Sequence, residues 1–109
     1  MKFINCLILE FYSGVQGGLC NDATEVIRSQ VQCIDALQKL GYRPLSVWWI
    51  GELSSIPSGC SVRINGRIDP HFEESSTGVG TGRSDLIPIC IRPHSLSGNF
   101  LSGLCLMSV

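Results

Sequence analysis

The sequence has few charged residues, and they form neither a basic patch nor a run of one sign. Charged residues make up 16% of the 109-residue chain, and the formal net charge is −1. Because nucleic-acid binding depends on clustered lysine and arginine side chains, this distribution argues against a nucleic-acid partner. Hydrophobic residues make up 44% of the chain, a share that is typical of one folded domain rather than a disordered segment.

The chain also lacks the short motifs that mark common catalytic and redox sites. It has no C-x-x-C pair for a redox dithiol or a zinc ribbon, and no serine in a G-x-S-x-G motif. The glycine-rich stretch at 78–85 leads into an apolar run typical of a strand, whereas a dinucleotide-binding loop opens a helix. We therefore expect no enzymatic activity and no cofactor.

No apolar run is long enough to cross a membrane as a helix, which takes about 20 residues. The C-terminal "NFLSGLCLMSV" is far shorter than that, and the N-terminal "MKFINCLILEFYSG" is interrupted by Asn5 and Glu10. The N-terminal stretch fits a degraded secretion signal, a first strand or the start of an incomplete gene. The sequence predicts no transmembrane segment.

Six dispersed cysteines are the strongest compositional feature. They are Cys6, Cys20, Cys33, Cys60, Cys90 and Cys105. An even number of widely spaced cysteines in a small chain favours a disulfide framework formed in an oxidising compartment. The alternative is a set of buried free cysteines that pack as small hydrophobic residues. We expect disulfides, and hence a secreted protein or one exposed at the cell surface.

The segment from Asp22 to Gly41 predicts an amphipathic helix of about eighteen residues. Asp22 is a favourable N-cap with Glu25 in the capping-box position, and Gly41 is the residue expected to end the helix. The apolar residues at three- and four-residue spacing are Val26, Ile27, Val31, Cys33, Ile34, Leu37 and Leu40. This face must pack on another element.

Short β-branched and aromatic runs predict strands. They lie at 44–51, 60–64, 67–72 and 86–91, and Pro88 places the last at an edge or gives it a bend. We therefore expect an α+β fold in which one amphipathic helix packs on a small, mostly antiparallel sheet stapled by disulfides.

Three regions divide the chain. Residues 1–19 form an apolar segment with a glycine-rich joint, 20–93 form the disulfide-stabilised α+β module, and 94–109 form an apolar tail.

The Asn65–Gly66 turn offers two registers for its hairpin. A two-residue turn mixes apolar with charged partners, whereas a three-residue loop at 64–66, with Gly66 at positive φ, separates an apolar face from a polar one. The pairs in the second register are Val62 with Ile68, Cys60 with Pro70, Ser61 with Asp69, and Arg63 with Arg67. We expect this second register.

The predicted helix limits the disulfide pairing. Cys33 lies about 16 Å along the axis from the cap, so Cys20 cannot come within the roughly 7 Å between Cα atoms that a disulfide needs. Two pairings remain for the central four: Cys20–Cys60 with Cys33–Cys90, or Cys20–Cys90 with Cys33–Cys60. Cys6 and Cys105 would then pair with each other.

Candidate site residues lie in two stretches. Asp69, His71 and Glu73 share one face of a predicted strand and are candidate metal ligands, although a polar strand end is the simpler interpretation. A second set forms a candidate binding surface for a protein or a carbohydrate. It comprises Trp48, Trp49, His71 and Arg83.

Three short motifs carry a resemblance to a known kind of module. "IPSGC" supplies Pro57, Gly59 and Cys60; "HFE" supplies Phe72; and "LIPIC" supplies Pro88, Ile89 and Cys90. With the cysteine-bearing helix, their order from 22 to 93 resembles a small cysteine-containing module of secreted and surface proteins of algae and other protists. His71 and Glu73 depart from its pattern. The resemblance implies an extracellular, non-enzymatic module and carries over no catalytic residue.

Our first hypothesis is a non-catalytic secreted or surface module for interaction or structure. The alternative is a small subunit of a membrane-associated assembly that docks through its apolar ends. A metal-dependent or redox enzyme is the third hypothesis.

Overall fold

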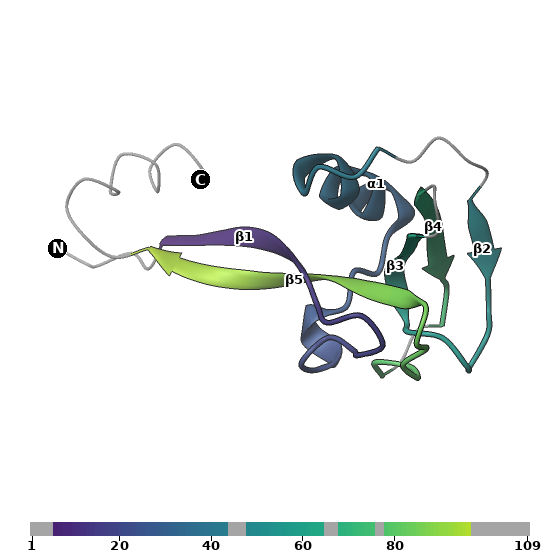
Figure 1. The fold of residues 1–109 in the computed structure, drawn as a ribbon. Helices are drawn as coiled ribbons and strands as arrows, with labels where there is room; N and C mark the ends of the chain where they lie inside the picture. The colour runs from purple at the N-terminus through teal and green to yellow at the C-terminus, as the bar shows by residue number, and fades with distance from the viewer. Residues whose placement is uncertain (1–5, 44–47, 65–67, 76–77, 97–109) are drawn as a thin grey trace, which may run out of the picture.

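The computed structural model describes residues 6–43, 48–64, 68–75 and 78–96. Within these residues a five-stranded sheet carries one α-helix and one 3-10 turn (Figure 1). The elements are β1 (Cys6–Ser13), η1 (Ala23–Glu25), α1 (Gln30–Lys39), β2 (Trp49–Gly51), β3 (Gly59–Ile64), β4 (Ile68–Glu73) and β5 (Leu86–Leu96). The predicted α+β class is confirmed.

The sheet is mixed rather than purely antiparallel. Its strand order is β1-β5-β3-β4-β2, and β2 runs parallel to β4 while the other neighbours are antiparallel. The connection from β2 to β3 passes the end of β4, where the buried carboxylate of Glu73 accepts a hydrogen bond from the Leu53 amide at 2.8 Å. The edge strand β1 comes from the segment 1–19, which the sequence analysis set apart from the module.

The predicted single helix is wrong in its first half. The Asp22 carboxylate accepts from the Thr24 amide and caps η1, while α1 begins after Ser29, whose hydroxyl accepts from the Gln32 amide. Between them Val26 forms a bridge with Cys90 of β5. Both Asp22 and Ser29 are good N-caps. Because the bridge with Cys90 holds Val26 in an extended conformation, the α-helix begins after Ser29.

The hairpin of β3 and β4 has the predicted faces but not the predicted pairs. Ile64 lies opposite Ile68 and Arg63 opposite Asp69, a shift of two residues from the expected register. A shift of two keeps each side chain on its face. It also replaces the expected pairing of Arg63 with Arg67 by an ion pair, with 3.1 Å between Arg63 Nη2 and Asp69 Oδ2. The predicted positive φ at Gly66 lies outside the described residues.

Two further strand predictions are corrected. The described part of 44–51 is a strand only at β2, which lies at the sheet edge and leaves Ile50 43% exposed. The strand predicted at 86–91 continues to Leu96 and lies inside the sheet, between β1 and β3, although it contains Pro88. Pro88 lies beyond the end of β1, where its carbonyl accepts from the Gly14 amide at 2.8 Å, so the ladder needs no donor from it.

The core lies on both sides of β5. In Figure 1, α1 lies on one side of this strand and η1 on the other. The α1 side holds the larger cluster, which consists of Ile27, Cys33, Ala36, Leu37, Cys60, Val62, Phe72, Ile89 and Ile91. The η1 side holds Cys20, Val26 and Cys90.

Each cluster contains one disulfide. Cys33–Cys60 ties α1 to β3, and Cys20–Cys90 ties the segment before η1 to β5. This is one of the two pairings that the sequence left open, and the exclusion of Cys20–Cys33 is confirmed. The predicted Cys6–Cys105 pair lies outside the described residues. No helix in the described part of the chain is long and apolar enough to cross a membrane.

Candidate functional site

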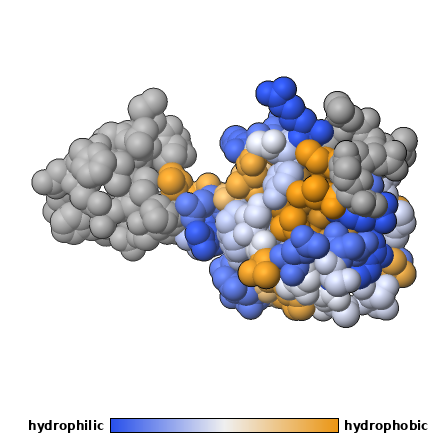
Figure 2. Space-filling view, viewed as in Figure 1, coloured by the Kyte–Doolittle hydropathy of each residue, from blue (hydrophilic) through white to orange (hydrophobic). Residues whose placement is uncertain are grey.

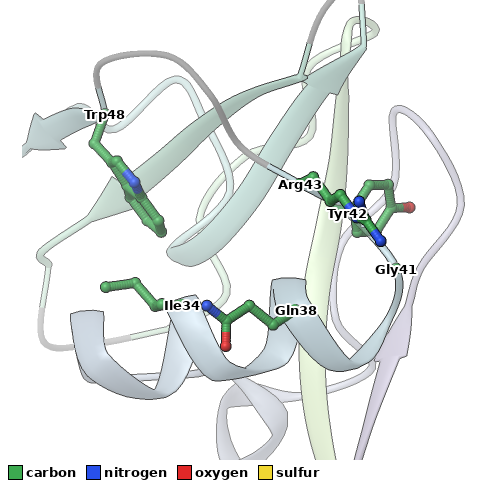
Figure 3. Close-up of a pocket in the computed structure, with 6 residues that line it drawn as sticks. All are labelled: Ile34, Gln38, Gly41, Tyr42, Arg43 and Trp48. Atoms are coloured by element: carbon green, nitrogen blue, oxygen red, sulfur yellow. The ribbon is translucent and has the colours of Figure 1, made fainter.

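An open cavity of about 530 Å³ lies between α1 and the chain that follows it (Figure 3). Its described lining consists of Ile34, Gln38, Gly41, Tyr42, Arg43 and Trp48. In Figure 3 the Trp48 ring points toward Ile34 on the helix, and Tyr42 and Arg43 lie at the other end of the opening. The cavity therefore presents aromatic, amide and guanidinium groups together.

The end of α1 shapes one wall of this cavity. Gly41 has φ of 89°, a conformation that glycine adopts without strain, and it ends the helix as the sequence predicts. The chain then folds back, because the Tyr42 amide donates to the Leu37 carbonyl at 2.8 Å. The Tyr42 hydroxyl lies 3.1 Å from Ser13 Oγ, which links this wall to β1.

One side of α1 is more open than the sequence predicts. Val31 and Ile34 belong to the predicted apolar face, yet they are 78% and 36% exposed. Figure 2 shows hydrophobic residues at the surface near α1 and the grey atoms. Ile34 is thus available to a ligand in the cavity.

Arg43 is the only charged residue in the described lining of the cavity. The other cationic side chains of the described residues each have an acceptor: Arg28 binds three carbonyls, Lys39 binds Asp35, Arg63 binds Asp69, Arg83 binds Asp85 and Arg92 binds Glu10. Among these residues no acceptor is placed against the Arg43 guanidinium. Arg43 therefore carries a positive charge that the described part of the fold does not neutralise.

The two tryptophans lie in different places. Trp48 packs partly against the α1-side core and lines the cavity. Trp49 stacks on His71, with ring centroids 5.8 Å apart and planes at 29°. Both are half-buried. Of the four residues of the predicted binding surface, Trp48 lines the cavity, whereas Trp49 and Arg83 lie near His71.

His71 is a buried residue of β4 on the face opposite the larger core. Burial lowers the pKa of its imidazole, and the positive charges of Arg83 and Arg63 lower it further. Its Nδ1 lies 3.2 Å from the Asp69 carbonyl oxygen. The lowered pKa therefore keeps the imidazole neutral near pH 7, and its contacts with Asp69 and Trp49 are part of the packing of the fold.

The carboxylates beside His71 are already bound to the protein. Asp69 forms an ion pair with Arg63, and Glu73 accepts from the Ser75 amide at 3.0 Å and the Ser75 hydroxyl at 2.7 Å. In the part of the chain that the structure describes, no group of three or more His, Cys, Asp or Glu side chains is arranged to hold a metal ion. The end of β4 is therefore polar, with Asp69, His71 and Glu73 on one face. Glu73 holds the adjacent loops through its hydrogen bonds with Leu53 and Ser75.

Arg83 is bound in the same way. Its Nε donates to Asp85 Oδ1 at 2.6 Å and its Nη2 to Oδ2 at 3.1 Å, and this bonding lowers the pKa of the Asp85 carboxyl. The structure places the charge of Arg83 near His71, away from the cavity.

Four residues of the cavity lining were not among the predicted site residues: Ile34, Gln38, Tyr42 and Arg43. An aromatic and a basic residue directly after the helix-ending Gly41 were the sequence signal for two of them.

Comparisons of the chain with protein-family models, curated protein sequences and solved structures find no match.

Proposed function

We propose that this chain is a non-catalytic recognition module, stabilised by disulfides, that acts outside the cell or at its surface. The ligand, a protein or a carbohydrate, binds in the cavity beside α1. The observation that carries the proposal is the cavity itself, where the Trp48 ring and the Gln38 amide open to solvent together with the Arg43 guanidinium, which no acceptor among the described residues neutralises. Specific ligand sites commonly combine apolar rings with a few polar groups of this kind.

The disulfides support the compartment. Cys33–Cys60 and Cys20–Cys90 join elements that are far apart in the chain, and both lie in core clusters. Such bonds persist in oxidising compartments and are rare in the reducing cytosol. The resemblance to secreted and surface modules of protists agrees with this assignment.

A binding screen tests the proposed function. The oxidised full-length chain is applied to an array of extracellular glycans and peptides, beside the variants Trp48→Ala and Trp49→Ala. We expect Trp48→Ala to weaken binding at least about tenfold, because aromatic residues in such sites carry much of the binding energy. Trp49→Ala is the matched control, since Trp49 stacks on His71 away from the cavity. Binding that survives Trp48→Ala unchanged would contradict the proposal.

A second candidate function is docking into a membrane-associated assembly through the apolar ends. In Figure 1 the first part of β1 and the last part of β5 extend beyond α1 as a two-stranded ribbon, and Figure 2 shows hydrophobic residues along it. Ile8 and Leu9, which point to opposite faces, are 43% and 64% exposed. Such a ribbon is only marginally stable without a partner. If the Leu9→Ser chain co-purifies with the same proteins as wild type, this candidate fails.

A further inference from the structure

The Arg43 guanidinium indicates the charge of the ligand. Among the described residues it is the one cationic side chain without a carboxylate or carbonyl acceptor, and it stands at the cavity opening. A guanidinium offers N–H donors in a planar fork that fits the two oxygens of a carboxylate. A ligand with a carboxylate therefore supplies the negative charge that no described residue places against Arg43.

The neighbouring side chains indicate the rest of the ligand. The Trp48 ring and Ile34 present apolar surface from two sides of the opening, and the Gln38 amide lies beside Ile34 on α1 (Figure 3). A sugar ring has apolar C–H faces that pack on an indole, and its hydroxyls both donate and accept as an amide does. The combination matches a pyranose better than a wholly apolar ligand.

The size of the cavity agrees with this class. Its volume of about 530 Å³ lies within the roughly 300–1,000 Å³ that small-molecule sites occupy. A folded protein partner would need to bury about 800 Å² on each side, for which this opening supplies only a part. The open form of the site allows a polymer to enter through one or two of its units.

We propose that the cavity binds a carboxylate-bearing sugar, namely adjoining uronic acid units of an acidic polysaccharide. At one end of the opening Arg43 holds the carboxylate of one unit, at the other end the Trp48 ring packs on the face of the next unit, and Gln38 binds a hydroxyl. This inference rests on the proposed recognition function and adds the class of ligand to it.

Fluorescence titration of the full-length chain tests the inference. The chain has two tryptophans, so Trp49→Phe leaves Trp48 as the reporter in the cavity. The probes are trigalacturonate, the neutral galactotriose and triglutamate. We expect trigalacturonate to change Trp48 fluorescence and to bind at least about tenfold more tightly than either of the others.

Charge variants in the same background identify the group responsible. Arg43→Gln should weaken trigalacturonate about tenfold, or ~1.4 kcal/mol, and should leave galactotriose unchanged. Lys39→Gln is the matched control, because it removes the same charge from a side chain that is paired with Asp35 and does not line the cavity. Added salt should weaken trigalacturonate binding to the chain with Arg43 more than to the Arg43→Gln variant.

The outcomes separate this inference from the proposed function. Equal binding of trigalacturonate and galactotriose, lost in Trp48→Ala when binding is measured by calorimetry rather than by tryptophan fluorescence, would overturn the uronate assignment and leave recognition at the cavity standing. Equal binding of triglutamate and trigalacturonate would overturn the sugar assignment. If none of the three probes binds, the inference is wrong, and the array screen with Trp48→Ala decides the proposed function by itself.

Discussion

Replacing Cys20 and Cys90 together by alanine should destabilise the protein more than replacing Cys33 and Cys60 together. The first disulfide spans 70 residues of sequence and the second 27. In the chain-entropy treatment, loop closure then contributes about 4.4 kcal/mol for the longer loop and about 3.6 kcal/mol for the shorter. All four cysteines are buried, so the packing losses are similar and the difference in loop length remains.

The shorter loop is nested in the longer one, so each bond shortens the loop that the other closes, and together they contribute somewhat less than the simple sum of about 8 kcal/mol. Single domains have a free energy of unfolding of about 5–15 kcal/mol, so we expect the chain without both disulfides to be largely unfolded. Urea denaturation followed by tryptophan fluorescence gives the free energy of unfolding of each paired variant. We expect the Cys20/Cys90 variant to lose about 0.8 kcal/mol more than the Cys33/Cys60 variant. The reverse order, or a loss below about 1 kcal/mol for either pair, would refute the loop-entropy reasoning.

Two further predictions concern single residues. Burial lowers the pKa of His71 in the folded state, so the unfolded chain binds more protons than the folded chain as the pH falls. The contribution of His71 to the free energy of unfolding is therefore fully present above about pH 6.5, and it is lost as the pH falls through the lower folded-state pKa. Urea unfolding at pH 7.5 and pH 5 should show this loss in wild type and a smaller one in His71→Gln, and equal losses would contradict the assignment. Gly59→Ala should lower the free energy of unfolding by about 2–4 kcal/mol, because φ is 74° and the new Cβ would meet the Ile27 carbonyl oxygen and, at 2.7 Å, Val26 Cγ1. Gly41→Ala is its control, with φ of 89° and no atom within 4 Å; it should lose only about 1–2 kcal/mol, and equal losses in the two variants would show that close packing at Gly59 is not the cause.

Alternation of side chains was enough to assign the faces of β3 and β4, but not their register. Registers that differ by two residues place the same side chains on the same face, so the apolar pattern could not separate them. The ion pair of Arg63 with Asp69 favours the observed register. Opposite charges on facing residues were therefore the sequence signal that distinguishes the two registers.

The start of α1 depended on contacts that are distant in sequence. The apolar spacing runs without a break through Val26 and Ile27, and Asp22 is a good cap, so local rules favour one long helix. The bridge of Val26 with Cys90 and the close approach of Gly59 to Ile27 require extended backbone there. No local pattern reveals such partners.

The cavity was the least predictable feature. Its wall forms because Gly41 reverses the chain, which the sequence indicated, but Arg43 matters because the described fold brings no acceptor to it. Whether a cation is paired depends on the whole fold, as the pairing of Arg83 with Asp85 and of Arg63 with Asp69 shows. Composition alone could not rank these arginines as ligand-binding groups.

Disulfide mapping of the full-length chain, purified without reductant from the cells that make it, tests the central claim most directly. Cleavage after lysine and arginine, which spares the Arg43–Pro44 bond, places Cys33 in residues 29–39 and Cys60 in residues 40–63, so their linkage appears as one joined pair of peptides. We predict that pair, together with a linkage of Cys20 to Cys90. Recovery of these four cysteines as free thiols would contradict a disulfide-stabilised module of an oxidising compartment.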